Sequence, residues 1–485
     1  MTTRRATVVG SGPNGLSAAV ALARAGFDVT VIEAHSGIGG GTRTAELTLP
    51  GFRHDVCSAV HPAAFTSPFF DAFGMREKVG WLVPDASYAH PLDGGRAAIA
   101  WRDIARTADG LGVDRRAWNA MLRPLARHID AVADVTGNQM LRVPRHPVTF
   151  VRFGLRALEL GSPLGRHSFR SEEAHALLTG VIAHANTALP SVAASAAGLL
   201  LASQAHAGGW GFPVGGAQAI PDALAEDLRA HGGRIETGRR VDDLSALDWG
   251  DPARGDVLVL DTSPRLALTH PDAHGSWAAA IRRFRYGPGA SKVDFALDGP
   301  VPWAHPDVHL SPTVHIGGTR AEIEAGENAV ARGRVPERPF VLAAQPSILD
   351  PTRAPKGKSV LWTYIHVPPG SSVDATETVT RQIERFAPGF RDRILASHAT
   401  TATEFAVYNP SAVGGDFAGG AVTFRQLIGR PVLSTSPWRT PMKGVYLASA
   451  STPPGPGVHG MAGWFAARLA IADATGERVE LEDLF

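Results

Sequence analysis

The chain has 485 residues and a net charge of +1; 44% of its residues are hydrophobic and 19% are charged. This length exceeds what one hydrophobic core usually holds, so we expect two or three domains. The balanced charge gives no general case for a nucleic-acid partner, and the single cysteine, Cys57, excludes an internal disulfide framework. Because neither a secretory signal nor a convincing membrane span is visible, we expect a cytoplasmic protein.

The first forty-odd residues predict a strand, a glycine-rich turn, a helix and a second strand. Residues 6–9 are apolar and mostly β-branched, and they run directly into the turn at 10–15. A helical spacing of apolar residues follows and stops at Gly26, a good position for a left-handed C-cap. Residues 27–32 form the next strand, which ends on Glu33. This order is typical of a dinucleotide-binding fingerprint.

Each part of the fingerprint has a physical reason. Gly10 permits the tight turn, Gly12 lets the backbone approach a pyrophosphate, and Gly15 lets the helix pack closely on the strand. The helix start offers free N–H groups and a positive dipole end to phosphates. An acid 18 residues after the last glycine, Glu33, can accept hydrogen bonds from ribose hydroxyls. The candidate cofactor-binding residues here are Gly10, Gly12, Pro13, Asn14, Gly15 and Glu33.

A second glycine cluster, residues 36–43, follows the acid directly and ends in Arg43. This arrangement resembles the flavin amine oxidase and phytoene desaturase superfamily, in which a Gly-Gly pair and an arginine follow the ribose-binding acid. The resemblance implies FAD as the cofactor, with the loop running past the pyrophosphate towards the flavin. It adds Gly40, Gly41, Thr42 and Arg43 to the candidates, although Arg43 alone could also be a surface arginine.

Residues 101–205 are expected to be mostly helical and to form a cap. The stretch 142–170 holds six arginines and one acid among large apolar residues. Two interpretations stay open: a solvated basic face of the cap, or a peripheral contact with an anionic membrane, which a lipid substrate would favour. Residues 174–221 carry no Asp, Glu, Lys or Arg, so this block is either the apolar wall of a pocket or ordinary core.

The chain then returns to the predicted cofactor domain. A Pro-Val-Gly-Gly turn at 213–216 precedes a helix at 219–231 and a strand at 234–237. The same order occurs in the phytoene desaturase superfamily, which implies that the backbone near Val241 faces the adenine. Residues 256–262 form a near-continuous apolar run, as expected for a buried parallel strand, and its end places Thr262 beside the dinucleotide.

Residues 281–425 predict a mixed sheet with long connections, because alternating strands are visible at 292–297, 340–344 and 359–365. Lys292 begins one of these strands in a stretch that resembles the monoamine-oxidase-like enzymes, where a lysine bonds through water to flavin N5. The alternative is a strand-end lysine that reaches solvent. His61 is the other catalytic candidate, since the analogy brings residues 53–61 close to the flavin.

The last segment, a strand at 444–450 and a helix opening at 458–470, completes the cofactor domain. The resemblance implies that the helix points its N-terminus at the flavin, where its dipole stabilises negative charge on the reduced ring. Val458 and Met461 are candidates there. Many relatives carry Gly-Asp at the strand end, whereas this chain has Ser449-Ala450, so the Ser449 hydroxyl would replace the acid.

The predicted fold is α/β: a Rossmann-type, glutathione-reductase-like FAD-binding domain (1–95, 206–290 and 430–485) with a mixed-sheet plus helical substrate domain (96–205 and 291–429). No metal site or nucleophile elbow is supported by the motif spacing. We expect an FAD-dependent dehydrogenase or desaturase that takes a hydride from a hydrophobic, isoprenoid or carotenoid, substrate. The alternatives are a flavin-dependent double-bond isomerase, an amine oxidase using Trp362, Tyr364 and Trp464, and an FAD-binding scaffold without turnover.

Overall fold

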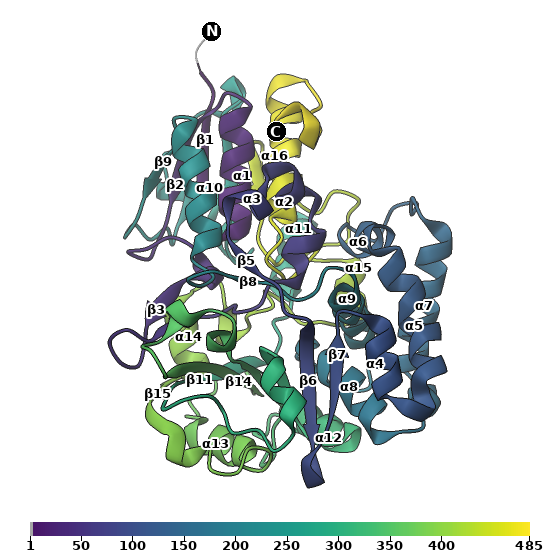
Figure 1. Cartoon of the computed structure of the whole chain (residues 1–485). Helices are drawn as coiled ribbons and strands as arrows, with labels where there is room; N and C mark the ends of the chain where they lie inside the picture. Colours follow the sequence, from purple (N-terminus) through teal and green to yellow (C-terminus); the bar gives the residue numbers. More distant parts are fainter. Residues whose placement is uncertain (1–2) are drawn as a thin grey trace.

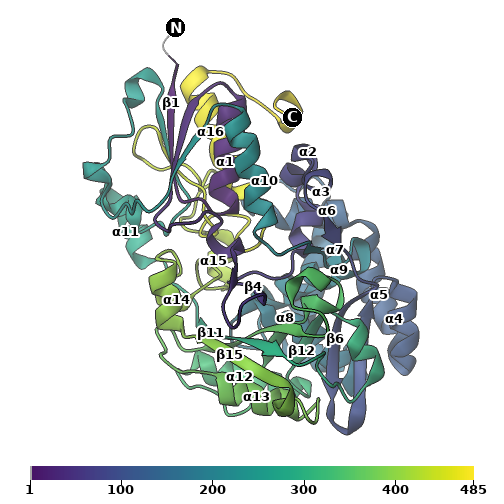
Figure 2. The ribbon, with the colours of Figure 1, turned by 60° about the vertical axis from the view of Figure 1, so that its left-hand side comes forward.

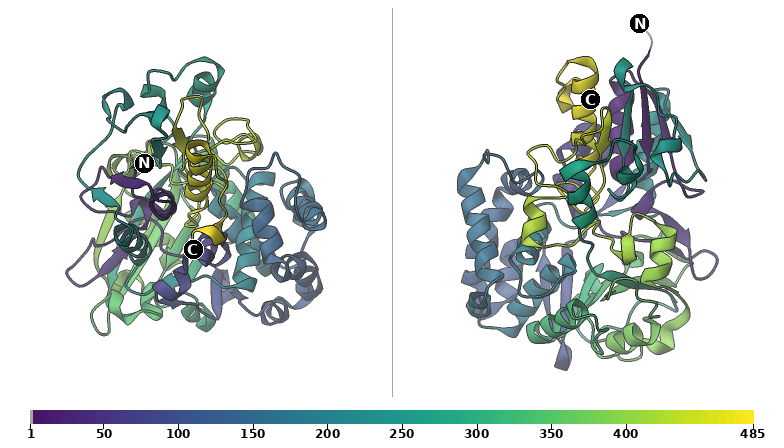
Figure 3. Two further views of the ribbon diagram at one scale, coloured as in Figure 1. Left: turned by 90° about the horizontal axis from the view of Figure 1, so that it is seen from above. Right: turned by 180° about the vertical axis from the view of Figure 1, so that it is seen from behind.

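The computed structural model describes residues 3–485 (Figure 1). The two chain ends meet in an upper part built on a parallel sheet, and a mixed sheet lies below it (Figures 1 and 2). A group of helices flanks the mixed sheet and lies to one side of the molecule when it is seen from above (Figure 3). This α/β arrangement is the predicted fold class.

Within residues 3–485, five parallel strands from three distant parts of the chain form the upper sheet, in the order β16-β10-β1-β2-β9. Val8 of β1 lies between Val31 of β2 and Val259 of β10, so apolar β-branched residues meet at the centre. Both faces of the sheet are covered by apolar clusters, as expected for a parallel sheet. The strands are β1 (Arg5–Val9), β2 (Asp28–Ile32), β9 (Arg234–Glu236), β10 (Val257–Leu260) and β16 (Val445–Leu447).

Three helices pack together on one face of this sheet. Small residues on the first of them let its neighbours approach closely, and Gly463 lies against the backbone of Asn14. The helices are α1 (Pro13–Arg24), α10 (Ala219–Ala230) and α16 (Met461–Thr475). The predicted helix from 458 therefore begins three residues later, after the left-handed residue Gly460.

Seven strands of the described chain form the mixed sheet, in the order β15-β11-β14-β13-β12-β6-β7. Alternate residues separate two interiors: Leu361 and Ile365 face an apolar core, whereas Trp362 and Tyr364 face the helices. The strands are β6 (Ala86–Leu92), β7 (Arg96–Trp101), β11 (Gly289–Leu297), β12 (Thr313–Ile316), β13 (Val341–Ala344), β14 (Ser359–Val367) and β15 (Ile394–Thr400).

The predicted boundary at residue 95 assigns β6 to the cofactor part, but β6 pairs with β7 and with β12 in the mixed sheet. The reason is a hairpin: Gly94 and Gly95 adopt positive φ and turn the chain directly from β6 into β7. A boundary drawn inside this turn separates two strands that hydrogen-bond to each other. Residues 86–95 therefore lie with the substrate part.

Helices dominate residues 104–207, as predicted, and α8 and α9 pack on the cavity side of the mixed sheet. The helices of this group are α4 (Ile104–Gly110), α5 (Arg115–Arg127), α6 (Ile129–Thr136), α7 (Pro147–Leu160), α8 (Glu172–Ile182) and α9 (Val192–Ala207). No helix within residues 3–485 combines the length and the apolar character that crossing a membrane requires.

The remaining elements connect the two parts or cover the mixed sheet. The short strands are β3 (Thr44–Glu46), β4 (Arg53–Asp55), β5 (Trp81–Leu82) and β8 (Phe212–Pro213). The helices are α2 (Pro68–Phe73), α3 (Met75–Lys78), α11 (Gly275–Arg283), α12 (Arg320–Ala331), α13 (Thr376–Glu384), α14 (Ala402–Tyr408) and α15 (Phe424–Ile428).

Candidate active site

One large cavity of about 1200 Å³ lies between the parallel sheet, the mixed sheet and the helical group. It brings together residues that are hundreds of positions apart in the chain. Every site residue predicted from the sequence lines it, except Gly15 and Met461. The lining residues among the predictions are Gly10, Gly12, Pro13, Asn14, Glu33, Gly40, Gly41, Thr42, Arg43, His61, Val241, Thr262, Lys292, Ser449 and Val458.

Asp261, the residue directly after β10, packs closely against the glycine-rich turn. Gly10 has a φ of 101°, and a Cβ there would lie 2.5 Å from the Asp261 carbonyl oxygen. A Cβ on Gly12 would lie 2.7 Å from the Asp261 carboxylate, and one on Gly15 would lie 2.1 Å from the carbonyl oxygen of Gly10. Gly15 therefore packs helix α1 onto the turn, as its spacing predicts, but it does not line the cavity, although it was also a candidate cofactor-binding residue.

Asp261 also accepts a hydrogen bond from the Gly15 N–H at 2.8 Å. Burial raises the pKa of Asp261 to about 7, and the negative charge of Glu33 adds to that effect. The carboxyl group lines the cavity beside the start of α1. Asp261 was not among the predicted site residues; its signal in the sequence is its position at the end of a parallel strand, where ligands bind in open α/β sheets.

Glu33 lies at the end of β2 and is almost fully buried. One carboxylate oxygen accepts from the Ser11 N–H at 3.0 Å and the Ser11 hydroxyl at 2.5 Å. The other accepts from the His35 N–H at 2.8 Å and from Arg43 at 3.1 Å. These four donors use the acceptor positions of the carboxylate. A ribose hydroxyl would therefore compete with the Ser11 hydroxyl, the most easily rotated of the four.

Arg43 is 6% exposed, so it is not the surface arginine that remained an alternative. Besides Glu33, it donates to the Gly37 carbonyl at 3.0 Å and lies 5.1 Å from the centre of the Tyr408 ring. It thus ties the second glycine cluster to the end of β2 and to α14. Tyr408 comes from the substrate part, and its location was not anticipated.

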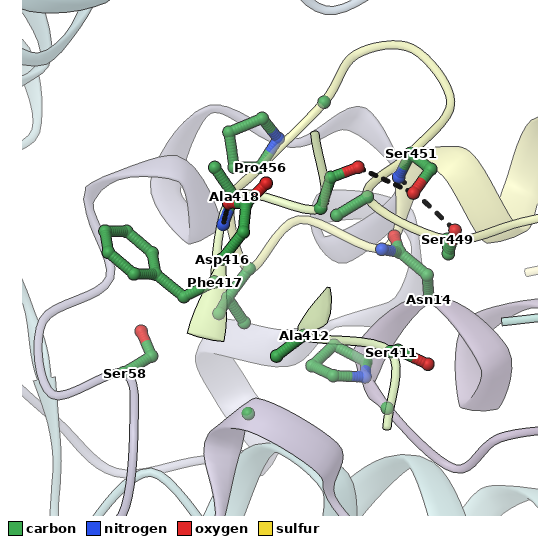
Figure 4. A pocket seen from close by; sticks show the side chains of 18 of the residues that line it. Asn14, Ser58, Ser411, Ala412, Asp416, Phe417, Ala418, Ser449, Ser451 and Pro456 are labelled. Carbon is green, nitrogen blue, oxygen red and sulfur yellow. Dashed lines mark hydrogen bonds between the residues drawn. The ribbon is translucent and has the colours of Figure 1, made fainter. Parts of the chain in front are cut away.

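Segments from the C-terminal half close the other side of the cavity (Figure 4). Asn14, Ser411 and Ser449 converge there from three separate segments, and Asn14 has a buried side-chain oxygen without a hydrogen-bond partner among residues 3–485. Ser449 accepts a hydrogen bond from the Ser451 N–H at 3.3 Å (Figure 4). Val458 lines the cavity, whereas Met461 is buried in the core of the parallel-sheet part and does not line it.

Lys292 lines the cavity and forms an ion pair with Asp294, two residues further along β11. Asp294 is fully buried, and its other oxygen lies 3.5 Å from His54 Nδ1. Burial raises the pKa of Asp294 to about 6, opposed by the charge of Lys292. Lys292 is 6% exposed, so the alternative of a strand-end lysine in solvent does not apply.

His61 also lines the cavity, at the end of the loop after β4. Its Nδ1 lies 3.4 Å from the Ser58 hydroxyl, and its buried Nε2 has no partner within residues 3–485. Burial lowers the pKa of His61 to about 4. The imidazole is therefore neutral at physiological pH, which suits a hydrogen-bonding role better than proton uptake.

A histidine pair lies further along the cavity wall. His184, after α8, lines the cavity, and its Nε2 lies 2.7 Å from Nε2 of His315 on β12. Burial lowers the pKa of His184 to about 3 and that of His315 well below its ordinary value. Both rings are neutral, so one donates and the other accepts. The uncharged block in the sequence pointed to a pocket wall near His184, but nothing local indicated His315.

The rest of the cavity wall is apolar and comes mainly from α7, α9 and α15. Trp362 and Tyr364 form its sheet side, with ring centres 5.2 Å apart. Trp464, the third aromatic residue considered for an amine-binding cage, is instead buried in the core beside α1. It lies on the inner face of α16, one turn from the helix start, so it packs against the sheet and not into the cavity.

These features fit a dinucleotide with a redox-active ring. The glycine cradle, the start of α1 and Glu33 line the same cavity as Lys292 and the apolar wall. The unpartnered Asn14 oxygen offers an acceptor beside the cradle. Residues 3–485 contain no cluster of three or more His, Cys, Asp or Glu side chains suited to a metal ion.

Comparisons with known proteins agree with this geometry. The chain is 27% identical to the pyridine nucleotide-disulfide oxidoreductase domain-containing protein 2 of Rattus norvegicus, over 96% of this chain and 93% of that protein. It is 24% identical to a neurosporene-forming phytoene desaturase of Rhodobacter capsulatus, over 95% of this chain and 92% of that protein. The solved structure of cyclohexylamine oxidase from Brevibacterium oxydans shares the fold, with a TM-score of 0.56, 16% identity and 98% and 99% of the two chains covered.

A family model described as flavin containing amine oxidoreductase matches residues 14–470. That span starts within α1 and ends within α16, so it includes both sheets, the helical group and the cavity between them. The chain therefore belongs to the flavin-containing amine oxidoreductase family.

Proposed function

We propose that this protein is an FAD-dependent dehydrogenase or desaturase that removes a hydride from a C–H bond of a hydrophobic substrate. The observation that carries the proposal is the continuity of the cavity. The dinucleotide cradle, Lys292 and the apolar side chains of α7, α9 and α15 all line this one cavity. Such a cavity suits a long apolar molecule held against a redox ring. The relatives named phytoene desaturase make an isoprenoid or carotenoid the first substrate class to test.

When bound, FAD would supply hydride acceptance at its N5 atom. The residues that would hold it are those of the cradle with Glu33, Arg43 and Val241. The apolar side chains of α7 and α9 would position the substrate and exclude water. Lys292, held by Asp294, would present its side chain to the bound molecules at the cavity wall.

The decisive experiment is anaerobic mixing of the FAD-loaded protein with candidate substrates while the flavin absorbance is followed. Bleaching by a polyene such as phytoene supports the proposal. Bleaching by amines alone would instead favour an amine oxidase, for which Trp362 and Tyr364 in the cavity wall are the specific observation. Conversion of a polyene without bleaching would identify an isomerase, and firmly bound FAD without any reaction would identify a scaffold.

A further inference from the structure

Helix α7 exposes an apolar stripe that no other part of the described chain covers. Val148, Val151, Leu155 and Leu158 follow the i, i+3, i+7, i+10 spacing of one helix face. They are 69%, 56%, 61% and 53% exposed. In a helix whose other side packs on α9, four exposed large apolar residues on one face are unusual for a water-exposed surface. We call these four residues the α7 stripe.

The segments on both sides of α7 extend this surface. Val143 is 89% exposed and Leu164 is 66% exposed. Figure 1 shows α7 at the outer edge of the helical group, away from both sheets. Val143 and Leu164 therefore add exposed apolar side chains in the segments that directly precede and follow this helix.

The charges beside the stripe are positive. Residues 142–170 hold six arginines and one acid, Glu159. Within residues 3–485, Arg142 pairs with Asp134 and Arg156 pairs with Glu159. The other four, Arg145, Arg152, Arg166 and Arg170, form no ion pair with the described residues. Arg152 lies next to the stripe on α7, and Arg145 lies just before the helix begins.

The stripe is also continuous with the mouth of the cavity. Phe150, Gly154 and Leu158, at i, i+4 and i+8, form the adjacent face of α7 and line the cavity. Phe150 is 38% exposed, and Leu158 belongs to both faces. Phe424 of α15 lines the same cavity and is 60% exposed. The exposed surface of α7 and the apolar wall of the cavity therefore share residues.

We propose that the α7 stripe and its free arginines dock the protein on an anionic lipid bilayer, with the cavity mouth facing the membrane. An apolar face flanked by unpaired arginines matches a bilayer interface, which buries the apolar side chains and attracts cations to its anionic headgroups. A second copy of the chain would place the same arginines against each other. This docking surface goes beyond the proposed reaction and does not depend on which substrate is used.

The test is co-sedimentation of the FAD-loaded protein with vesicles of phosphatidylcholine alone and of equimolar phosphatidylcholine and phosphatidylglycerol. We expect binding to the anionic mixture that weakens at high salt. Val151→Asp with Leu155→Asp removes the apolar contact and should lower affinity by at least about tenfold on the anionic vesicles. Arg145→Gln with Arg152→Gln should lower affinity about 25-fold, about fivefold for each arginine, on the anionic mixture only.

Val407→Asp is the matched control, because Val407 is 79% exposed on α14, on the opposite side of the molecule in Figures 1 and 2. It should bind vesicles as the wild type does. All the substituted positions are exposed, and unchanged FAD content checks that each variant is folded. The proposal is overturned if the wild type binds neither vesicle, or if Val407→Asp loses as much affinity as the stripe variant. Light scattering that shows a dimer dissociated by the stripe variant, without vesicle binding, would instead assign the surface to a second copy.

Discussion

Asp261 should make FAD binding depend on pH. Its buried carboxyl lies under the glycine turn, where a diphosphate would bring further negative charge. With a pKa of about 7, half of the carboxyls are neutral at pH 7, and about ten of eleven are charged at pH 8. Binding therefore favours the protonated form. Since proton loss disfavours the complex, FAD affinity should fall as the pH rises through 7.

The size of the effect follows from two competing costs. Protonating Asp261 costs about 1.4 kcal/mol for each pH unit above its pKa. Holding two like charges close together in partly buried surroundings costs several kcal/mol. FAD should therefore bind with Asp261 protonated, because protonation costs less free energy than the charge repulsion, up to at least two pH units above the pKa. The dissociation constant for FAD should rise about tenfold between pH 6 and pH 8, in proportion to the loss of the neutral form.

Asp261→Asn isolates this effect, because an amide oxygen can still accept the Gly15 N–H bond but never becomes charged. Its affinity, measured by quenching of FAD fluorescence on titration into the apoprotein, should be flat from pH 6 to 8 and about tenfold tighter than wild type at pH 8. Asp242→Asn, an exposed acid on the same cavity, should keep the wild-type slope. Equal slopes for the wild type and Asp261→Asn would refute the reasoning.

Three further outcomes are expected. Gly15→Ala would place a Cβ 2.1 Å from a backbone oxygen and should lower the free energy of unfolding, measured by urea titration, by about 1–3 kcal/mol or more. The control Gly154→Ala, which has open space around its Cβ position, should not lower the free energy of unfolding. Arg353→Met would leave the buried carboxylate of Asp55, its partner at 2.8 Å, without a counter-charge, and should lower the free energy of unfolding by about 3–5 kcal/mol. Adding Asp55→Asn to this variant should restore part of that loss. Lys292→Met should slow reoxidation of the reduced flavin by oxygen about 100-fold in stopped-flow absorbance, if the lysine assists proton movement; an unchanged rate would remove it from the mechanism.

The cofactor end could be predicted from the sequence because its geometry is set by near neighbours. The turn at 10–15, the helix after it and Glu33 lie within one strand-helix-strand unit, and the backbone requirements of glycine fix their arrangement. The pairing of Lys292 with Asp294 could also have been predicted. Residues two apart on a strand share a face, so a buried lysine at 292 is expected to form an ion pair with the acid at 294.

The rest depends on contacts between distant segments. Asp261 reaches Gly15 across 246 residues, and His184 meets His315 across 131. No local pattern carries such contacts, because β10 and β12 are recognisable as strands without showing which turn or helix they meet. The boundary at residue 95 failed for a related reason. A Gly-Gly turn is compatible with both a linker and a hairpin, and only the pairing of its two strands decides between them.

The two faces of the mixed sheet explain how buried polar side chains can lie beside the cavity. On β14, Leu361 and Ile365 anchor one face in a fully apolar core, which makes the strand rigid. The opposite face of the same sheet can then hold buried polar groups, such as Asp294 and His315, without local collapse, because their positions are fixed by the strands and not by their own contacts. Buried groups with incomplete hydrogen bonding are costly and are expected mainly where chemistry needs them. The apolar side chains of α7, α9 and α15 supply the rest of the cavity wall.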